Sequence, residues 1–321
     1  MSLGVRPSRR ALSSLYQALD FTDHLRLSEP DLGYTTIRST STENIDANRY
    51  RDILAYDHAL LPGPYLNAAY IPPFHPTSVS FIISQAPPPD TYTAFYTHIV
   101  QQRVRVLVNL TPLIEKGRRK ADQYWPNHSV GVSGSEGDAE MELGNGWKVT
   151  SESEKQIELQ QGEATLVRRV IHIDTAQTDG SKNGWAVTQF HLSSWPDHGV
   201  FPTSLLLQLM HETQQVAMPK IYPPPPTWIH CSAGVGRSGT LAAAYIARAA
   251  INVARHEGTL AGDADDSLMA RNQRSHVWDL PVRIVEHLRR YRARMVQTIE
   301  QFEAVYEIVG ELAKQAGSAE K

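Results

Sequence analysis

The 321-residue sequence contains one cysteine and no stretch of eighteen consecutive apolar residues. A single cysteine excludes an intramolecular disulfide, so the composition gives no sign of an oxidising compartment. The lack of a long apolar run argues against a membrane span, and residues 1–10 lack the apolar core of a signal peptide. We therefore expect a cytoplasmic or nuclear location.

The chain also lacks a strong charge of either sign. It has 31 lysine and arginine residues against 34 aspartate and glutamate residues, for a formal net charge of −3. This balance argues against a general nucleic-acid binder or a membrane-surface protein. The length leaves ample chain for a buried core, in one large domain or two small ones.

The one cysteine lies in the most informative stretch of the chain, residues 228–246. An apolar run leads to Cys231, a loop with three glycines follows, and a run rich in alanine and leucine comes next. The first run predicts a buried strand and the last a helix. Glycines in such a turn let backbone N–H groups converge, and a helix N-terminus adds partial positive charge. The stretch therefore predicts an anion-binding loop.

Cys231 and Arg237 stand at the two ends of this loop. A thiol that faces converging N–H groups and a helix N-terminus ionises easily, with a pKa of roughly 3.5–7.5 in such settings. The planar fork of an arginine holds two phosphate oxygens at once. A thiolate below a bound phosphate is placed to attack phosphorus, so we expect phosphate hydrolysis through a phosphocysteine.

Two other interpretations of the loop compete with this one. Gly234, Gly236 and Gly239 spell G-x-G-x-x-G, and Glu257 lies about twenty residues further on, as in dinucleotide-binding turns. A lone cysteine is also most often a buried structural residue. Neither interpretation requires both Cys231 and Arg237.

Residues 230–240 resemble, position for position, the loop of classical, non-receptor type protein tyrosine phosphatases in which five residues separate the cysteine from the arginine. Further stretches resemble loops of the same family in the same order. They are the phosphotyrosine-recognition loop (48–52), the glutamic acid loop (115–126), the Trp-Pro-Asp loop (194–200) and the glutamine loop (292–298). The resemblance covers about residues 20–311. It departs at Ala69, where the family usually has serine, and at Ala86, where it normally has glycine.

The resemblance implies an α/β fold, with a twisted mixed β-sheet flanked by helices on both faces. The catalytic domain would span residues 20–312, after a partly helical N-terminal extension (1–19) and before a flexible C-terminal tail (313–321). Residues 127–146 and 257–276 would be surface insertions. The prolines at 223–226 either stiffen the approach to the cysteine strand or bind a proline-recognition domain.

Residue patterns predict the individual elements of this fold. We expect helices over residues 11–27, 91–102, 203–217, 239–256, 280–292 and 298–312, with Thr203 as an N-cap. We expect strands over residues 81–87, 104–110, 147–150, 157–159, 164–173 and 185–192, in addition to the strand before Cys231.

The resemblance also implies a role for each site residue. Cys231 would attack phosphorus, Arg237 would hold the phosphoryl oxygens, and Asp197 would act first as general acid and then as base. Gln297 would position the hydrolytic water, and Ser238 would stabilise the departing thiolate. The substrate would be bound by Tyr50, Asp52, Lys120, Ser232, Ala233, Gly234, Val235, Gly236 and Gln301. In supporting roles, Glu115 would orient Arg237 and Tyr124 would brace His230.

The implied partners are phosphotyrosine-containing proteins, recognised by a monomer that needs no metal and no cofactor. Two other functions stay open. One is a phosphotyrosine-binding module without turnover, against which intact Cys231, Arg237 and Asp197 argue. The other is a dual-specificity or phosphoinositide phosphatase. Tyr50 favours a deep slot instead, and the uncharged Ala233 and Val235 add no positive charge for a polyphosphorylated headgroup.

Overall fold

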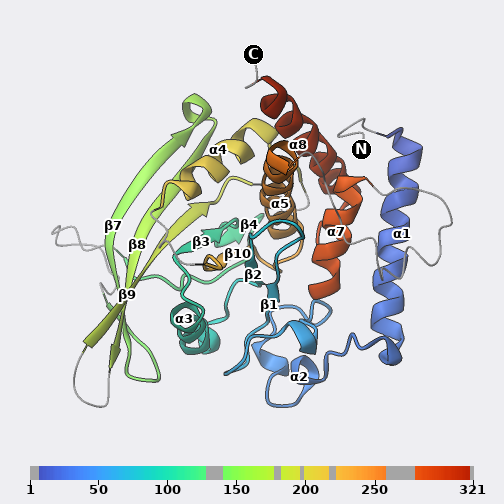
Figure 1. Ribbon diagram of the computed structural model, residues 1–321. Helices are drawn as coiled ribbons and strands as arrows, with labels where there is room; N and C mark the ends of the chain where they lie inside the picture. The colour runs from blue at the N-terminus through green and yellow to red at the C-terminus, as the bar shows by residue number, and fades with distance from the viewer. Residues whose placement is uncertain are drawn as a thin grey trace.

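The computed structural model describes residues 7–127, 140–176, 182–195, 199–216, 222–257 and 279–318. Its centre is an eight-stranded mixed sheet in the order β1-β2-β10-β3-β9-β8-β7-β6 (Figure 1). The strands are β1 (Ala68–Ile71), β2 (Phe81–Ser84), β3 (Val106–Asn109), β6 (Glu140–Glu142), β7 (Lys148–Leu159), β8 (Ala164–Ala176), β9 (Lys182–Leu192) and β10 (Thr227–His230). A separate two-stranded hairpin joins β4 (Ile114–Glu115) to β5 (Arg118–Arg119).

Four parallel strands, β2, β10, β3 and β9, form the middle of the sheet. Their side chains alternate between two apolar cores. Trp228 and Leu107 enter one core, whereas Ile229 and Val108 enter the other. Burial on both faces is typical of parallel strands, and it explains why these segments read as apolar runs. Because the strands are parallel, the loops after β3 and β10 leave the sheet at the same edge.

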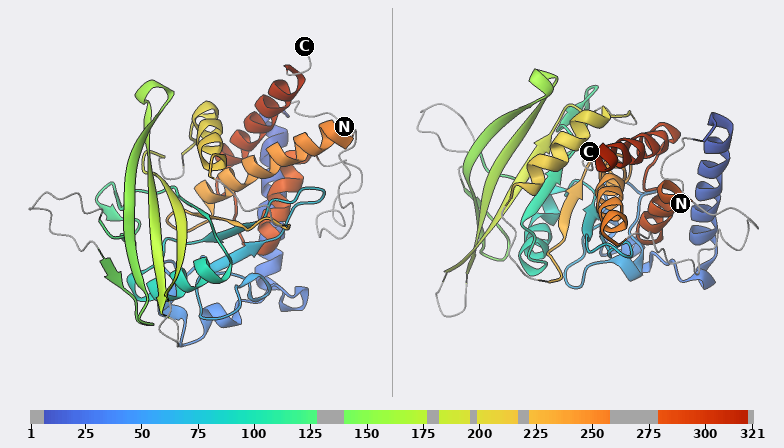
Figure 2. Two further views of the ribbon diagram at one scale, coloured as in Figure 1. Left: turned by 60° about the vertical axis from the view of Figure 1, so that its left-hand side comes forward. Right: turned by 45° about the horizontal axis from the view of Figure 1, so that its top comes forward.

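Helices cover both faces of the sheet, as predicted (Figure 2). On one face, α3 (Tyr92–Gln101) packs Phe95, Tyr96 and Ile99 against the strands. On the other face lie α4 (Thr203–Gln214), α5 (Gly236–Glu257), α7 (Leu280–Tyr291) and α8 (Ile299–Ser318). The N-terminal helix α1 (Arg9–Ser28) packs on α7 and α8, and the short α2 (Ile37–Thr40) follows it. None of the described helices has the length and apolar character needed to cross a membrane.

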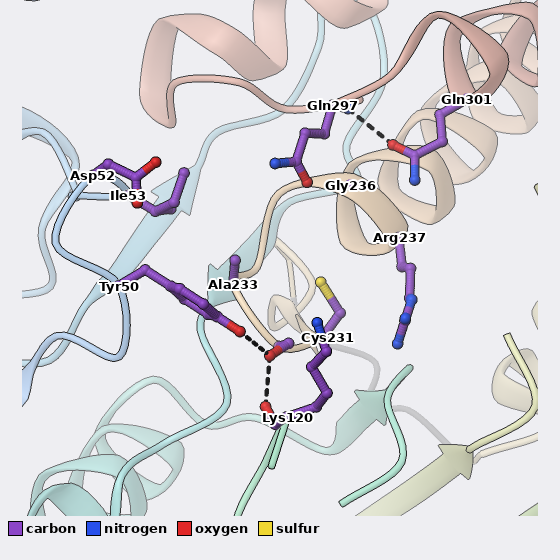
Figure 3. Close-up of a pocket in the computed structure, with 11 residues that line it drawn as sticks. Tyr50, Asp52, Ile53, Lys120, Cys231, Ala233, Gly236, Arg237, Gln297 and Gln301 are labelled. Carbon is purple, nitrogen blue, oxygen red and sulfur yellow. Dashed lines mark hydrogen bonds between the residues drawn. The ribbon is translucent and has the colours of Figure 1, made fainter. Parts of the chain in front are cut away.

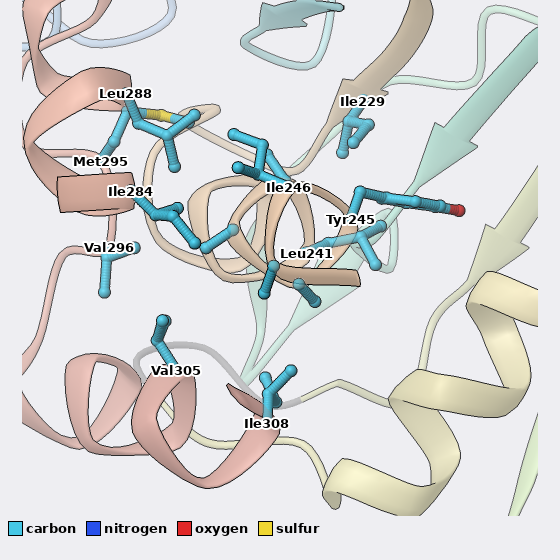
Figure 4. Close-up of a cluster of buried hydrophobic side chains, with 14 of the residues drawn as sticks. Ile229, Leu241, Tyr245, Ile246, Ile284, Leu288, Met295, Val296, Val305 and Ile308 are labelled. Atoms are coloured by element: carbon cyan, nitrogen blue, oxygen red, sulfur yellow. The ribbon is translucent and has the colours of Figure 1, made fainter. Parts of the chain in front are cut away.

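Helix α5 is the centre of the larger core (Figure 4). Its Leu241 and Ile246 lie among residues of α7 and α8, such as Ile284 and Val305, and beside Met295 of the loop between those helices. Three consecutive alanines, at 242–244, are fully buried on α5 and let its neighbours approach closely. This packing fixes the helix whose first turn follows the cysteine loop.

Two expectations about the sheet are wrong. The segments predicted as separate strands at 147–150 and 157–159 are one strand, β7, which pairs with β8 along its length, with a register shift between Ser151 and Ser153. Residues 152–156 between them are polar and exposed, so backbone pairing holds this part of β7 without an apolar pattern. In the insertion predicted at 127–146, β6 adds to the edge of the sheet beside β7. Residues 128–139 of that insertion lie outside the described residues, as do residues 258–276 of the second insertion.

Two helix ends also differ from expectation. Thr203 is the first residue of α4 and not its cap, because the N-cap position is Pro202 and no side chain caps the helix there. Helix α8 continues to Ser318, so the tail predicted to be flexible from residue 313 is helical up to that point. Leu312, Ala313 and Ala316 contact the core and extend the helix.

The proline run at 223–226 leads directly into β10. Pro225 and Pro226 are buried, while Tyr222 is 89% exposed. Burial of these two prolines favours the interpretation that the run stiffens the approach to the strand.

A buried histidine on β9 predicts sensitivity to acid. Burial lowers the pKa of His191 from 6.5 to about 4, while its ring Nε2 donates to the carbonyl oxygen of Thr111 at 2.9 Å. Below pH 6.5 the unfolded chain binds a proton at this site that the folded protein does not. The free energy of unfolding therefore falls as the pH drops from about 6.5 toward 4, by about 2 kcal/mol at pH 5 from this residue.

His191→Gln keeps a donor for Thr111 but does not titrate. Urea unfolding at pH 7.5 and pH 5 should show that the variant loses about 2 kcal/mol less than the wild type on acidification. Equal losses in the two proteins would contradict a neutral His191 in the folded state.

Candidate active site

The loop between β10 and α5 is shaped by contacts that only glycine allows. Gly234 has φ +71°, and a Cβ added there would lie 2.0 Å from the carbonyl oxygen of Ser84. A Cβ at Gly239 would lie 2.4 Å from the backbone nitrogen of Val296. The G-x-G-x-x-G spacing thus has a packing reason within this fold, without a dinucleotide.

A buried arginine that the sequence interpretation did not single out holds this loop from behind. The guanidinium of Arg292 donates to the carbonyl oxygens of Gly234 at 2.8 Å and Ala233 at 2.9 Å, and to Oδ1 of Asn67 at 2.8 Å. Burial lowers the pKa of Arg292 to about 10, so the side chain stays cationic at neutral pH. In a trans peptide the N–H points opposite to the C=O, so the N–H groups of Gly234 and Val235 point away from Arg292.

In front of the loop is a small pocket of about 140 Å³ (Figure 3). The structure brings most of the predicted site residues into its lining. The lining consists of Tyr50, Asp52, Ile53, Lys120, Cys231, Ser232, Ala233, Gly236, Arg237, Gln297 and Gln301. Cys231 is 5% exposed and its sulfur lies within this set of side chains. The pocket therefore gathers residues from four separate segments around one thiol.

Arg237 is held in place by the loop after β3 and by the β4–β5 hairpin. Its Nη1 donates to the carbonyl oxygen of Leu110 at 3.1 Å and to Oγ1 of Thr111 at 3.0 Å. Its Nη2 lies 2.8 Å from Oε2 of Glu115. The pairing expected between Glu115 and Arg237 is thus present, and it fixes the guanidinium at the edge of the pocket.

His230 is buried behind the cysteine as a neutral ring. Burial lowers its pKa to about 3. Its Nδ1 lies 3.2 Å from the carbonyl oxygen of Cys231, which only accepts, so the ring proton is on Nδ1 and Nε2 is the acceptor. Tyr124 then donates to Nε2 at 2.7 Å, and its hydroxyl accepts from Gln189 at 2.8 Å. The expected contact between Tyr124 and His230 is present.

Tyr50 forms one wall of the pocket, as Figure 3 shows. The hydroxyl of Ser232 donates to the carbonyl oxygen of Lys120 at 2.6 Å. That hydroxyl is therefore the acceptor for Tyr50, whose OH lies 2.7 Å away. This chain of two hydrogen bonds fixes the tyrosine ring relative to the cysteine loop.

Asp52, which the resemblance assigns to substrate binding, lines the pocket. Its side chain is 68% exposed and its Oδ2 accepts from Nη1 of Arg294 at 3.0 Å. Arg294 is a second arginine that the sequence interpretation missed. It and Arg292 both lie in the stretch recognised as the glutamine loop, where only Gln297 received a role.

Two glutamines and a serine complete the site. The backbone N–H of Gln297 donates to Oε1 of Gln301 at 2.9 Å, and both side chains lie against Gly236 (Figure 3). Ser238 is fully buried in the first turn of α5, and its hydroxyl has no hydrogen-bond partner among the described residues. Val235 is likewise fully buried and faces the core.

The prediction for Asp197 falls on residues 196–198, which lie outside the described residues. On either side of them the chain is well packed. Trp195 stacks on Phe201 with ring centroids 5.2 Å apart, and its Nε1 donates to the carbonyl oxygen of Gly199 at 3.2 Å.

Three kinds of comparison relate this chain to known proteins. The family model of protein-tyrosine phosphatases matches residues 44–311. Human receptor-type tyrosine-protein phosphatase zeta is 30% identical over 303 residues, and chicken receptor-type tyrosine-protein phosphatase S is 32% identical over 279 residues. These alignments cover 91% and 81% of this chain, but only 12% and 16% of the two relatives.

A solved structure of PTPN18 in complex with HER2-pY1196 phosphopeptides has the same fold. It superposes with a TM-score of 0.72 over 96% of this chain and 95% of that one, at 23% sequence identity. Together with the family match over residues 44–311, the fold and the pocket around Cys231 lead to one conclusion. The chain belongs to the protein-tyrosine phosphatase family.

Proposed function

We propose that this chain hydrolyses phosphotyrosine in proteins through a phosphocysteine intermediate. One observation carries the proposal: Cys231 and Arg237 line the same small pocket, at the N-terminus of α5 and beside the fixed ring of Tyr50. A nucleophile, a bidentate oxyanion ligand and an aromatic wall are the groups that a phosphotyrosine side chain requires. PTPN18, captured with phosphopeptides on the same fold, is a precedent for such a substrate.

In the first step the phosphate would lie between Arg237 and the N–H groups of Gly234 and Val235. Their direction away from Arg292 and the partial positive charge of the α5 N-terminus favour an anion there. The thiolate of Cys231 attacks phosphorus, the S–P bond forms and the bond to the tyrosyl oxygen breaks. We assign the proton that the leaving oxygen takes up to Asp197.

In the second step a water molecule attacks the phosphocysteine. Gln297 would orient this water, Asp197 would take its proton, and the S–P bond would break to release phosphate and the thiolate. The buried hydroxyl of Ser238 fits a role as donor to the departing sulfur, since it has no other partner in the described part of the chain. The active site needs no further group to close the cycle.

Substrate selectivity is the direct test of this function. The Tyr50 wall implies a slot that a phosphoserine or phosphothreonine side chain is too short to cross. We expect kcat/KM for phosphotyrosine peptides to exceed that for matched phosphothreonine peptides by at least about 10²-fold, with phosphate release unaffected by EDTA.

Cys231→Ser is the matched control and should release no phosphate while still binding the phosphotyrosine peptide, because an alcohol is a poor nucleophile at neutral pH. Comparable rates on phosphotyrosine and phosphothreonine would instead assign a dual-specificity phosphatase. Faster release from inositol phosphates would assign a phosphoinositide phosphatase, and binding without turnover by the wild type would assign a phosphotyrosine-binding module.

Arg237→Lys tests the bidentate contact. A lysine keeps the positive charge, but its ammonium group makes a single-point contact with the phosphate in place of two parallel N–H bonds. It also does not reproduce the hydrogen bonds that the planar guanidinium makes to Leu110, Thr111 and Glu115. We expect its kcat/KM to fall almost as far as that of Arg237→Ala. Steady-state kinetics of both variants check this, and near-normal activity in the lysine variant would show that charge alone is sufficient.

Asp197→Ala tests the general acid. Such catalysis contributes about 10²–10⁴-fold, so kcat on phosphotyrosine should fall by that factor while KM changes little. The loss should shrink for an aryl phosphate whose phenol is acidic, because that group departs without a proton. An equal loss on acidic and basic leaving groups would mean that Asp197 acts on the structure of its loop.

A further inference from the structure

The loop that carries Gln297 is held in place by a helix that lies before the region matched by the family model. That model begins at residue 44, whereas α1 spans Arg9–Ser28. Packed against α7 and α8, α1 meets the segment between them, residues 294–297. The contacts are specific hydrogen bonds to the backbone of that segment.

This segment needs external support because its backbone is strained. Arg294 has φ +61° and Val296 has φ +60°, both in the left-handed region. That region is unfavourable for residues with a Cβ, and a β-branched valine is an outlier there. Such a conformation persists only where the surroundings fix it.

Tyr16 on α1 makes the contact nearest to the proposed chemistry. Its hydroxyl donates to the carbonyl oxygen of Gln297 at 2.5 Å and lies 3.5 Å from that of Val296. On the other side of the same residue, the N–H of Gln297 donates to Gln301. The backbone of Gln297 is thus held at both its C=O and its N–H.

Charged groups of α1 and α7 hold the rest of the segment. Asp23, 4% exposed, accepts from the backbone N–H of Arg294 at 2.8 Å. Arg289 of α7, fully buried, donates to the carbonyl oxygens of Met295 at 2.9 Å and Val296 at 3.0 Å. Asp20 on α1 in turn binds Arg289 at 2.7 Å. Residues 16, 20 and 23 are spaced to lie on one face of the helix.

We propose that Tyr16 is a positioning residue for the second step of the reaction, acting through Gln297. The inference rests on the phosphocysteine mechanism proposed above. Tyr16 bonds the glutamine's carbonyl oxygen, while Arg237 is fixed by contacts from other segments, with Leu110, Thr111 and Glu115. Loss of the Tyr16 hydroxyl should therefore displace the water-orienting amide and slow hydrolysis of the phosphocysteine, but leave its formation nearly unchanged.

Tyr16→Phe in the full chain removes only the hydroxyl and keeps the ring, which packs on Phe302 with centroids 5.7 Å apart. The experiment follows phenol release from an aryl phosphate with an acidic phenol by rapid mixing. The fast phase reports phosphocysteine formation and the slow phase its hydrolysis. The amplitude of the fast phase gives the concentration of active enzyme, and dividing the slope of the slow phase by it removes any effect of the folded fraction.

We expect the slow phase of Tyr16→Phe to fall about fivefold, the factor that corresponds to one net hydrogen bond, with the fast phase within about twofold of the wild type. Tyr306→Phe is the matched control. It removes a hydroxyl from α8 that donates to Asp279 at 3.0 Å, away from the Gln297 segment, and should leave both phases within about twofold.

A slow phase unchanged in Tyr16→Phe, or equal slowing of both phases, would overturn the inference while the proposed function stands. A wild type that turns over phosphotyrosine peptides without Cys231 becoming phosphorylated would overturn the mechanism, and the inference with it. The failure of the inference is measured on the Tyr16→Phe variant, and the failure of the proposed mechanism is measured on the wild type. The two failures can therefore be told apart.

Discussion

The arrangement of the active site depends on a buried guanidinium beneath the cysteine loop. Arg292 binds two consecutive loop carbonyls and Asn67, and so joins the loop to the stretch that leads into β1. The desolvation cost of burying this cation is offset by three hydrogen bonds to oxygen, and truncation would leave those carbonyls without donors. Because the carbonyls of Ala233 and Gly234 point toward Arg292, the N–H groups of Gly234 and Val235 point to the opposite side of the loop and are available for an anion. One side chain thus orients two consecutive peptide groups of the turn.

The rest of the fold holds this turn between two rigid elements. Strand β10 pairs on both sides, with β2 and β3, so the position of Cys231 is fixed by two ladders of backbone hydrogen bonds. Helix α5 is enclosed by α7 and α8, which fixes where the first turn after the loop begins. A loop held between such elements is organised before any ligand arrives, and that lowers the entropic cost of binding.

Much of this could be predicted from the sequence where the determinants are local. The run around Cys231 contains its strand, its glycines and its helix in one stretch, and β3 and α3 have clear apolar patterns. The prediction of strands failed where a neighbouring strand, and not the residue pattern, decides the structure. The exposed middle of β7 has no apolar pattern and is a strand because β8 lies beside it.

Contacts between segments far apart in the chain also could not be predicted from residue patterns. Tyr16 and Gln297 are separated by 281 positions, and Arg292 meets Asn67 across 225. No local sequence feature distinguishes Tyr16 or Arg292 from a surface residue, because their burial is a property of the packed helices. By contrast, the pairs Glu115–Arg237 and Tyr124–His230 were expected, since the family resemblance supplies long-range information that periodicity lacks.

The single thiol of this chain has a chemical consequence of its own. When a peroxide converts a cysteine to a sulfenic acid, the usual rescue is condensation with a second cysteine nearby. Cys231 is the only cysteine among the 321 residues, so the chain offers it no resolving thiol. A neighbouring backbone nitrogen can condense with the sulfenic acid, with loss of water, to give a sulfenamide that protects the sulfur. Return to the thiol then needs an external thiol small enough to enter a pocket of about 140 Å³. The size of this pocket therefore limits which reductants can reach the sulfur of Cys231.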